Sequence, residues 1–543
     1  MLILKYKMCG IFAILYSSPS SSETPPSSYK LNIQPNIETL TKRGPDRTKS
    51  IINPEFELVF HRLCINDVSE NGDQPFVNDR ESIYVMCNGE IFNYKSLVKK
   101  YNLNLTSQSD CEVILRLYEK GLLTKEVVEE FNGDFAFFIY DKYKNKVILC
   151  RDRIGVRPLF YGFTKNNDFV VSSEVKAMSL CDEIHHVLPS TITTYLLENK
   201  REVDVNRYYQ ILNRLTYSKP CENLRALLIN SVKMRLLSDR PIGCLLSGGL
   251  DSSIVALILC KFIEPKNVRT YSIGMEGSLD LQYAKKVATF LKTNHTEVIF
   301  TPEEALRAIP EVIYHLESYD ITTVRASVGM YLLGKYISEN TNDKVIFSGE
   351  GSDEILCGYL YFHYAPTPRY AHEESLRLIS ELYKYDVLRA DRCISSHGLE
   401  LRVPFLDPAV VNFCSTLHGE LKAPNGRIEK EVLRNQFRGE LPDDVLWRRK
   451  DGFSDGVSSK TKSWYEYIQE FVENEISDEE FKTSSSSEEP CVSKEAYYYK
   501  KVYNYFFPFY PKPIDYYWMP KWVKVDKSNP SGRILKVFNE KEK

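Results

Sequence analysis

The pattern of apolar and polar positions divides the chain into two halves with different periodicities. Upstream of residue 200, short apolar segments are separated by turn-forming residues, at 56–65, 82–92, 133–141, 146–152 and 168–175. Short apolar segments bounded by Gly, Asn, Asp and Ser are typical of β-strands. This half is therefore predicted to be an all-β or α+β unit.

Downstream of residue 240, strand-like runs alternate with longer helical runs. Strands are expected at 242–246, 270–273 and 344–347, and helices at 253–263, 281–291 and 325–338. Such alternation is typical of βαβ units, so it predicts an α/β domain with a parallel sheet. The region after residue 370 is predicted to be mostly helical.

Polar stretches suggest where the chain is divided. Residues 204–220 form a polar connector after the strand-rich half, which predicts an N-terminal domain at 9–205 and a C-terminal domain at 221–543. Two stretches rich in Ser, at 17–28 and 483–490, are expected to form surface loops.

Composition narrows the class of protein. The 543 residues carry 70 Lys and Arg against 73 Asp and Glu, a net charge of −3. Electrostatics therefore gives no reason to expect a nucleic acid or an anionic membrane as a partner. No apolar run reaches the roughly 20 residues that span a bilayer.

The number and spacing of the cysteines indicate whether the protein works in a reducing or an oxidising compartment. Thirteen cysteines occur without a CxxC pair, which fits neither a disulfide framework nor a zinc site. Reduced thiols and a cytoplasmic location are therefore expected. A secretory signal is the competing interpretation, since a short apolar run at 9–16 follows two lysines.

A glycine-rich segment at 247–253, SGGLDSS, follows a predicted strand and opens a predicted helix. Glycines let the backbone approach a phosphate, and free N–H groups at the helix start can bind it. The Walker A spacing is absent, and the segment matches the pyrophosphate signature of enzymes that cleave ATP to AMP. Asp251 beside a polyanion makes sense with Mg²⁺ between them. The competing interpretation is a helix start capped by Asp and Ser.

A second polar loop, SGEGSDE at 348–354, follows the predicted strand at 344–347. Open α/β sheets bind ligands at the carboxyl ends of their strands, so both loops are expected at one site. Asp353 would supply a second metal carboxylate, and Glu350 would lie near the activated substrate. Taken alone, this loop would be an ordinary turn.

Cys9, in the sequence MCGI, has a chemical role if it is the mature N-terminus. A thiolate is a good nucleophile, and a free α-amino group with a pKa of about 8 is a suitable adjacent base. This requires either that translation starts at Met8 and that Met is removed, or that the first eight residues are cleaved. Otherwise Cys9 is an ordinary buried cysteine.

Other polar residues in this half could hold an amino acid by both ends. Arg62 could clamp a carboxylate, and Asp110 could bind an α-ammonium. Asn88 and Gly89 could donate hydrogen bonds to an oxyanion, and Glu90 could accept one from an amine. Each of them singly could also be a surface charge or a turn residue.

Together these motifs resemble the glutamine-hydrolysing asparagine synthetase family over nearly the whole chain. The first half resembles class II glutaminases in MCGI, RGPD at 43–46, HRL at 61–63, NGEIFNY at 88–94, SDCEVI at 109–114 and RDRIGVRPLFY at 151–161. The second half resembles the synthetase in LLSGGLDSS at 245–253, ESYDITTVRAS at 317–327, FSGEGSDE at 347–354, HGLELRVPFLD at 397–407, FSDGV at 453–457 and DYYWMPKW at 515–522.

The resemblance implies a fold and an activity. The glutamine amidotransferase type 2 domain at 9–205 would contain layered antiparallel sheets between helices (αββα), and 221–543 would be an ATP-pyrophosphatase-type α/β synthetase. The implied reaction makes L-asparagine from L-aspartate, L-glutamine and ATP through β-aspartyl-AMP, with AMP, pyrophosphate and L-glutamate as further products. The cofactors would be ATP and Mg²⁺, and the resemblance leaves a homodimer open.

The resemblance also assigns roles to residues by motif. Cys9 would be the nucleophile, Asn88 and Gly89 the oxyanion hole, Glu350 a residue for aspartyl-AMP formation, and Arg325 and Lys450 cationic partners of the phosphates. Because Lys450 follows two arginines, a solvated basic run is its alternative interpretation. The glutamine site would comprise Arg62, Leu63, Cys64, Ile65, Asn66, Asn88, Gly89, Glu90 and Asp110. The ATP site would comprise Leu246, Ser247, Gly248, Gly249, Asp251, Ser252, Ile273, Ser348 and Gly349, with Asp251 and Asp353 as metal ligands.

Three alternatives remain open at this level. The chain could be another ATP-dependent amide-forming enzyme on the same scaffold, such as a β-lactam synthetase, although the MCGI start argues against that. It could be a catalytically inactive binding protein, against which the two intact loops argue. It could also retain only ammonia-dependent synthesis, if the residues before Cys9 persist.

Overall fold

The structure is a computed structural model that describes residues 9–17, 33–44, 46–198, 201–211, 221–459, 461–485, 491–523 and 535–539. The chain forms two compact units. The first comprises Met1–Gln210, Leu237–Arg240 and Ser395–Glu400, and the second comprises Ile211–Leu236, Pro241–Ile394 and Leu401–Lys543. The predicted loop at 17–28 lies outside the described residues from position 18 onward.

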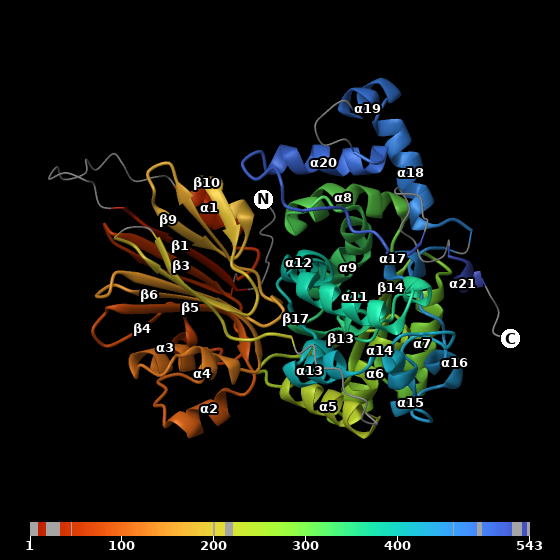
Figure 1. Cartoon of the computed structure of the whole chain (residues 1–543), viewed down its shortest axis with the longest axis horizontal. Helices are drawn as coiled ribbons and strands as arrows, with labels where there is room; N and C mark the ends of the chain where they lie inside the picture. The colour runs from red at the N-terminus through yellow and green to blue at the C-terminus, as the bar shows by residue number, and fades with distance from the viewer. Residues whose placement is uncertain are drawn as a thin grey trace. The chain divides into compact units, whose positions relative to one another are not determined.

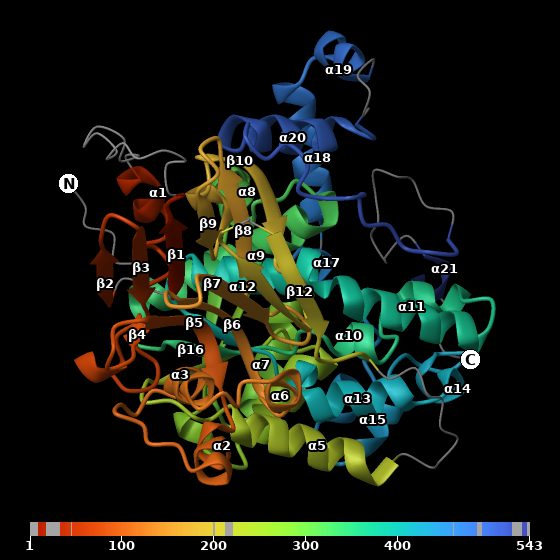
Figure 2. The ribbon, with the colours of Figure 1, turned by 60° about the vertical axis from the view of Figure 1, so that its left-hand side comes forward.

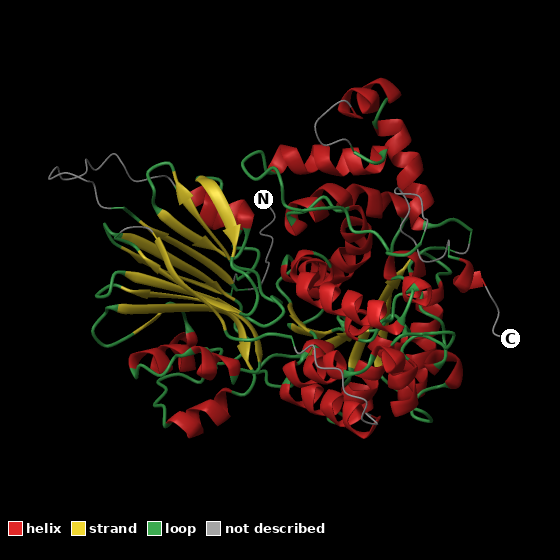
Figure 3. Cartoon of the chain, viewed as in Figure 1, coloured by secondary structure: helices red, strands yellow, loops and turns green. Residues whose placement is uncertain are grey.

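The first unit contains two six-stranded sheets in which all paired strands are antiparallel (Figure 3). One sheet has the order β10-β8-β9-β1-β3-β2, and the other has the order β12-β11-β7-β6-β5-β4. The strands are β1 (Gly10–Leu15), β2 (Arg47–Ile52), β3 (Phe56–Arg62), β4 (Phe76–Val77), β5 (Ile83–Ile91), β6 (Gly133–Asp141), β7 (Lys146–Arg151), β8 (Phe160–Thr164), β9 (Phe169–Ser172), β10 (Cys181–His186), β11 (Thr191–Leu196) and β12 (Arg201–Arg207). Its helices are α1 (Gln34–Thr39), α2 (Tyr94–Tyr101), α3 (Glu112–Glu119) and α4 (Lys125–Glu129).

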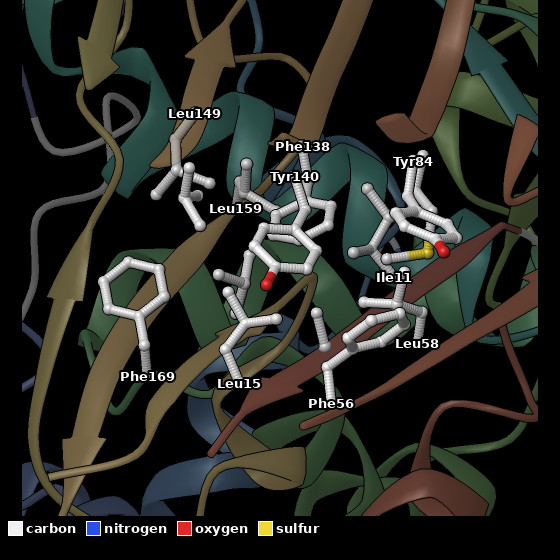
Figure 4. Packing of buried hydrophobic residues seen from close by; sticks show 14 of the residues in the cluster. Ile11, Leu15, Phe56, Leu58, Tyr84, Phe138, Tyr140, Leu149, Leu159 and Phe169 are labelled. Carbon is white, nitrogen blue, oxygen red and sulfur yellow. The ribbon is translucent and has the colours of Figure 1, made fainter. Parts of the chain in front are cut away.

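The core of this unit lies between the two sheets. Side chains alternate between the two faces of a strand, so every second residue of β1, β3 and β6 points into the same layer. Figure 4 shows these residues packed against one another. They include Ile11, Ala13, Leu15, Phe56, Leu58, Phe60, Ala136, Phe138 and Tyr140, all of them buried. The α+β prediction for this half is confirmed.

Two segments, predicted to be a connector at 204–220 and a surface loop at 483–490, belong in part to a strand and a helix. The first residues of the predicted connector at 204–220 belong to β12, because Val205 and its neighbours pair with β11. In the second stretch, residues 483–485 end a helix that begins at Asp478. That helix is supported at its start, where the Ser477 hydroxyl accepts from the backbone N–H of Glu480. Residues 212–220 and 486–490 lie outside the described residues.

The second unit is built on a five-stranded sheet with the order β15-β14-β13-β16-β17. Its strands are β13 (Ile242–Leu245), β14 (Arg269–Gly274), β15 (Asn294–Ile299), β16 (Val345–Phe347) and β17 (Glu400–Arg402). β13 pairs in parallel with β14 and β16, and β14 pairs in parallel with β15. The predicted parallel sheet is therefore confirmed, and the carboxyl ends of β13, β14 and β16 share one edge.

Helices surround this sheet (Figure 1). They are α5 (Cys221–Met234), α6 (Leu250–Leu259), α7 (Leu279–Leu291), α8 (Pro302–Leu316), α9 (Ile321–Asn340), α10 (Ser352–Ile355), α11 (Pro368–Glu381), α12 (Asp386–Ser395), α13 (Pro408–Thr416), α14 (Gly419–Lys422), α15 (Glu431–Gln436), α16 (Asp443–Leu446), α17 (Phe453–Gly456), α18 (Trp464–Glu475), α19 (Asp478–Ser485), α20 (Lys494–Phe506) and α21 (Lys536–Asn539). Helices α18 and α20 pack on each other and on α8, and in Figure 2 they stand out from the rest of this unit together with α19.

Two expectations drawn from composition can be compared with the described residues. All twelve cysteines whose side chains are described are free thiols, and most of them are buried. Within the described parts of the chain, no helix combines the length and the apolar character needed to cross a bilayer.

Candidate active sites

Cys9 lies directly before β1, with its thiol against the residue that follows β3. The N–H of Leu63 donates to Cys9 Sγ at 3.3 Å, and the thiol faces the Leu63 carbonyl at 3.5 Å. Arg43 Nε donates to the Cys9 carbonyl at 3.0 Å, which fixes the backbone at this position. Burial raises the pKa of the Cys9 thiol well above its usual range, although the Leu63 N–H and Arg62 oppose this. The thiol therefore needs a base before it can act as a nucleophile.

Strand β5 carries the two predicted oxyanion residues. Asn88 is buried, and its Nδ2 has no hydrogen-bond partner among the residues that the structure describes. Gly89 has φ +123°, and a Cβ there would lie 2.0 Å from the carbonyl oxygen of Asp134, so only glycine fits. A buried amide donor without an acceptor is costly, and an oxygen atom of a ligand would remove that cost. This geometry suits a donor for a developing oxyanion.

Two buried carboxylates meet at one amide beside these residues. Asn66 Nδ2 donates to the Glu90 carboxylate and, at 3.2 Å, to Asp110 Oδ1. The Ile91 N–H donates to Asp110 Oδ2 at 2.6 Å. Burial raises the pKa of Asp110, while these hydrogen bonds act in the opposite direction. The structure thus brings three predicted glutamine-site residues into one acidic network, which is the chemistry that binds an ammonium group.

Arg62 organises the loop that follows β3. Its Nη1 donates to Asp73 Oδ1 at 2.6 Å and to the Ser69 carbonyl at 2.7 Å, and its Nη2 donates to the carbonyls of Asn66, at 3.1 Å, and Asp67. Its predicted contact with a substrate carboxylate stays a prediction. Sequence reasoning missed Asp73, which lies in none of the motifs.

The two remaining predicted residues of this loop, Cys64 and Ile65, are held through their backbones. The Cys64 N–H donates to Asp46 Oδ2 at 3.1 Å, and the Ile65 carbonyl accepts from the Asp239 N–H at 3.0 Å. Both residues are buried. These contacts fix the course of the loop that carries Leu63 and Asn66.

The second unit has a cavity of about 130 Å³ at the carboxyl edge of its sheet. Gly248 has φ +71°, and a Cβ there would lie 2.4 Å from the backbone of α7, so the turn between β13 and α6 requires glycine. Gly249 is the N-cap of α6. Every predicted ATP-site residue except Gly248 lines the cavity: Leu246, Ser247, Gly249, Asp251, Ser252, Ile273, Ser348 and Gly349.

Two lysines and two carboxylates meet in this cavity. Lys430 Nζ lies 2.6 Å from Asp251 Oδ2 and 2.7 Å from Asp353 Oδ1, and Lys450 Nζ lies 2.7 Å from Asp353 Oδ2. Burial alone would raise the pKa of Asp353, but the two lysines lower it. Burial alone would lower the pKa of Lys450, but Asp353 and Asp251 raise it. Lys450 is therefore a partly exposed cation that is paired with a carboxylate, and not part of a solvated basic run.

A second cavity, of about 190 Å³, shares Glu350, Asp353 and Lys450 with the first. Arg389 also lines it, and Arg389 Nη2 donates to Glu350 Oε2 at 3.0 Å. Burial raises the pKa of Glu350, and Arg389 opposes that rise. Sequence reasoning missed Lys430 and Arg389, because neither lies in a motif that was singled out and both reach the site only through the fold.

Comparisons with known proteins match both halves of the chain. A family model described as glutamine amidotransferase domain matches residues 8–223, and one described as asparagine synthase matches residues 223–371 and 365–508. The chain is 40% identical over 580 residues to the asparagine synthetase [glutamine-hydrolyzing] of Rattus norvegicus, covering 99% of this chain and 100% of that protein. Proteins of the same name from Homo sapiens (40% over 572 residues, 97% and 98%) and Gallus gallus (39% over 575 residues, 98% and 99%) are similarly close.

The chain belongs to the glutamine-hydrolysing asparagine synthetase family. In the first cavity of this asparagine synthetase family member, two side chains have the chemistry of Mg²⁺ ligands. Asp251 and Asp353 offer carboxylate oxygens, the ligands that Mg²⁺ prefers. Among the described residues, no group of three or more His, Cys, Asp or Glu could form a metal site without a substrate. Mg²⁺ is commonly held by one or two carboxylates plus substrate phosphates, so this pair fits.

Arg325 lies in the wall of the second cavity, which Lys450 also lines. Its Nε donates to Glu495 Oε1 at 2.6 Å, Gln469 Nε2 donates to the other oxygen of Glu495 at 2.7 Å, and the guanidinium stacks on the ring of Tyr465. Arg325 and Glu495 are both buried. The charge of Arg325 is therefore balanced within the protein, and a direct role toward phosphates in this asparagine synthetase family member stays a prediction.

Proposed function

We propose that this chain is an enzyme that makes L-asparagine from L-aspartate, using ammonia released from L-glutamine and cleaving ATP to AMP and pyrophosphate. Family membership supports the overall reaction. The observation that carries the chemistry is that two neighbouring cavities share Glu350, Asp353 and Lys450. If ATP binds in the first cavity and aspartate binds in the second cavity, their reacting groups would come together beside these three side chains.

In the glutaminase half, the Cys9 thiol would attack the side-chain carbonyl carbon of glutamine. The α-amino group of Cys9 would take the thiol proton and deliver it to the leaving nitrogen, so that ammonia departs as the C–N bond breaks. The Asn88 side-chain amide and the Gly89 N–H would stabilise the oxyanion, and Glu90 with Asp110 would hold the α-ammonium. Water would then hydrolyse the thioester and release L-glutamate.

In the synthetase half, an oxygen of the aspartate β-carboxylate would attack the α-phosphorus of ATP and displace pyrophosphate. The new P–O bond gives β-aspartyl-AMP, which supplies the leaving group that a carboxylate lacks. Lys430 and Lys450 would bind the departing pyrophosphate. Ammonia would attack the acyl carbon and displace AMP, and Glu350, whose pKa burial raises, would be suited to accept the proton from that nitrogen.

Asp251 and Asp353 would hold Mg²⁺, which when bound would neutralise charge on the pyrophosphate. This metal site can be tested without measuring turnover. Calorimetry would measure the affinity of the protein for pyrophosphate with and without Mg²⁺. Asp251→Asn is expected to weaken the Mg²⁺-dependent part of that affinity roughly tenfold or more. Equal affinity in wild type and variant would remove Asp251 from the metal site.

The decisive experiment measures products of the purified enzyme with aspartate, ATP and either glutamine or ammonium. We expect asparagine, AMP and pyrophosphate with both nitrogen sources. Cys9→Ala is expected to lose glutamine-dependent synthesis and to keep the ammonium-dependent reaction. ADP and orthophosphate as nucleotide products, or loss of both activities in Cys9→Ala, would contradict the proposal. A substrate panel scored by pyrophosphate release separates aspartate from the acids that other amide-forming enzymes activate.

Eight residues precede Cys9 in the sequence, and they raise a second candidate function, asparagine synthesis from ammonium alone. If they remain attached in the working protein, the α-amino group is blocked and only ammonium-dependent synthesis is expected. N-terminal sequencing of active protein decides between the two. A sequence that starts at Cys9 supports the glutamine reaction, and one that starts upstream supports synthesis from ammonium alone.

Three further assignments belong to the same proposal. The glutaminase domain would comprise 9–205 and the synthetase domain 221–543. The protein would work in the cytoplasm, as its free cysteines suggest. It would form a homodimer, which size-exclusion chromatography with light scattering would detect as twice the 62.9 kDa mass of the chain.

A further inference from the structure

The segment 514–523, here called the tail segment, runs along the wall of the second cavity. Lys384 pairs with Asp515, and Lys521 Nζ lies 2.5 Å from the buried carboxylate of Glu374. The Tyr385 hydroxyl donates to the Tyr516 carbonyl at 3.1 Å. These contacts hold the segment against α11 and the start of α12.

Two residues of the tail segment, Trp518 and Pro520, line the second cavity together with Glu350 and Lys450. The indole of Trp518 packs against the rings of Tyr359 and Tyr361, with centroids 6.0 and 5.9 Å away. The tail segment is therefore part of the boundary of the cavity in which the carboxylate would be activated.

Asp320 joins the tail segment to the rest of this wall. The Oδ1 of Asp320 accepts a hydrogen bond from the backbone N–H of Trp518 at 2.8 Å. Its Oδ2 accepts from the N–H and the hydroxyl of Thr323, at 2.9 and 2.7 Å, which caps helix α9. Asp320 is fully buried, and Thr322 and Thr323 of α9 line the same cavity. One carboxylate thus fixes two parts of the wall to each other.

We propose that Trp518 closes the cavity that receives aspartate and keeps water from β-aspartyl-AMP, and that Asp320 is the positioning residue that holds Trp518 there. This inference rests on the proposed function. Water that reached the intermediate would attack its acyl carbon, displace AMP and regenerate aspartate, so ATP would be consumed without asparagine. Exclusion of water from reactive intermediates is a recognised reason for closing an active site.

The test is the ratio of pyrophosphate released to asparagine formed, measured with ammonium as the nitrogen source, together with KM for aspartate and for ATP. Trp518→Ala is expected to raise the ratio well above the wild-type value and to raise KM for aspartate about fivefold, with KM for ATP nearly unchanged. Trp518→Phe keeps an aromatic wall and is expected to restore most of the wild-type ratio. A protein that merely packs less well would lose turnover without a change in this ratio.

Asp320→Asn tests the positioning role with almost no change in volume. The amide has only one oxygen, so it can accept either from Thr323 or from Trp518, and its NH₂ faces an N–H donor on the other side. The same rise in the ratio is expected as for Trp518→Ala. Thr301→Ala is the matched control, because it removes the cap of α8, whose Thr301 Oγ1 accepts from the Glu304 N–H. It is expected to lower stability and leave the ratio unchanged.

Two results separate the inference from the function on which it rests. If wild-type protein forms no asparagine from aspartate and ammonium, the proposed function is wrong and the inference falls with it. If wild-type protein is active but Trp518→Ala and Asp320→Asn, each folded by urea unfolding, keep the wild-type ratio and KM for aspartate, only the inference is wrong. If Trp518→Ala does not fold, the ratio and the KM for aspartate of Asp320→Asn decide whether the inference holds.

Discussion

Lys430 Nζ lies 2.6 Å from Asp251 Oδ2, at the place where the two polar loops of the synthetase half meet. Only 1% of the Lys430 side chain is exposed, so its ammonium is balanced by carboxylates and not by water. The same ammonium contacts Asp353 on the second loop. A single cation therefore holds together two carboxylates that would otherwise repel each other.

Removing this cation is expected to destabilise the protein strongly. In Lys430→Met the side chain keeps its length, but Asp251 loses its cationic partner while it stays buried. Breaking a buried pair from one side costs about 3–5 kcal/mol, and urea unfolding measures that loss in the free energy of unfolding. Lys142→Met, which removes an exposed pair with Glu55, is the control and should cost less than about 1 kcal/mol. Equal losses in the two variants would show that Lys430 is not a structural cation.

Asn88→Ala is expected to separate the two half-reactions. Its buried Nδ2 has no acceptor among the described residues, so the variant loses a donor for the oxyanion but breaks no hydrogen bond recorded for that nitrogen. Loss of one such donor typically lowers kcat about 10²- to 10³-fold. Glutamine hydrolysis should fall by that amount, while ammonium-dependent asparagine synthesis stays at the wild-type rate. A comparable fall in both reactions would argue against the oxyanion role.

Gly89→Ala is expected to damage the same site through the backbone. The added Cβ would lie 2.0 Å from the Asp134 carbonyl, and φ is +123°, so β5 must shift against β6. Glutaminase activity should be lost together with stability. Gly121→Ala is the matched control, because Gly121 has φ +68° but no atom within 4 Å of the added Cβ. It should cost only the conformational strain, about 1–2 kcal/mol, with glutaminase activity retained.

Asp152 gives a pH dependence of stability. Burial, followed by repulsion from Asp134, raises the pKa of Asp152 to about 6, while the unfolded value is about 3.9. Between these values the folded state binds more protons than the unfolded state. The Asp152 contribution is therefore fully present below pH 3.9 and is lost as pH rises through about 6, with a slope of at most about 1.4 kcal/mol per pH unit.

Urea unfolding of Asp152→Asn between pH 4 and 7 checks this expectation. The variant should lack that falling slope relative to wild type, even if it is less stable overall because the amide has only one acceptor oxygen. The exposed Asp79→Asn should leave the slope as in wild type. An identical slope in wild type and Asp152→Asn would show that Asp152 does not titrate in this range.

The elements that sequence predicted best are those whose pattern reflects a local cause. The alternating apolar residues of β3, β5 and β6 follow from period-2 burial, and the glycines before α6 follow from the backbone geometry of the turn. Helix starts were less accurate: α6 begins at Leu250 and α9 at Ile321, three and four residues earlier than expected. In both cases the helix begins beside its N-cap, Gly249 or Asp320, and not where the apolar run starts.

By itself, the sequence of this protein determined two domains of different sheet type, the family, and the motifs that contain Cys9, Asn88, Asp251 and Asp353. These depend on motifs and periodicities that are local in the chain. The tertiary structure alone decided that Lys430 bridges Asp251 and Asp353, that Glu495 balances Arg325, and that Trp518 reaches Asp320. Each of those contacts joins residues from about 80 to 200 positions apart, and hydrophobic burial brings them together without leaving a sequence signal at either end.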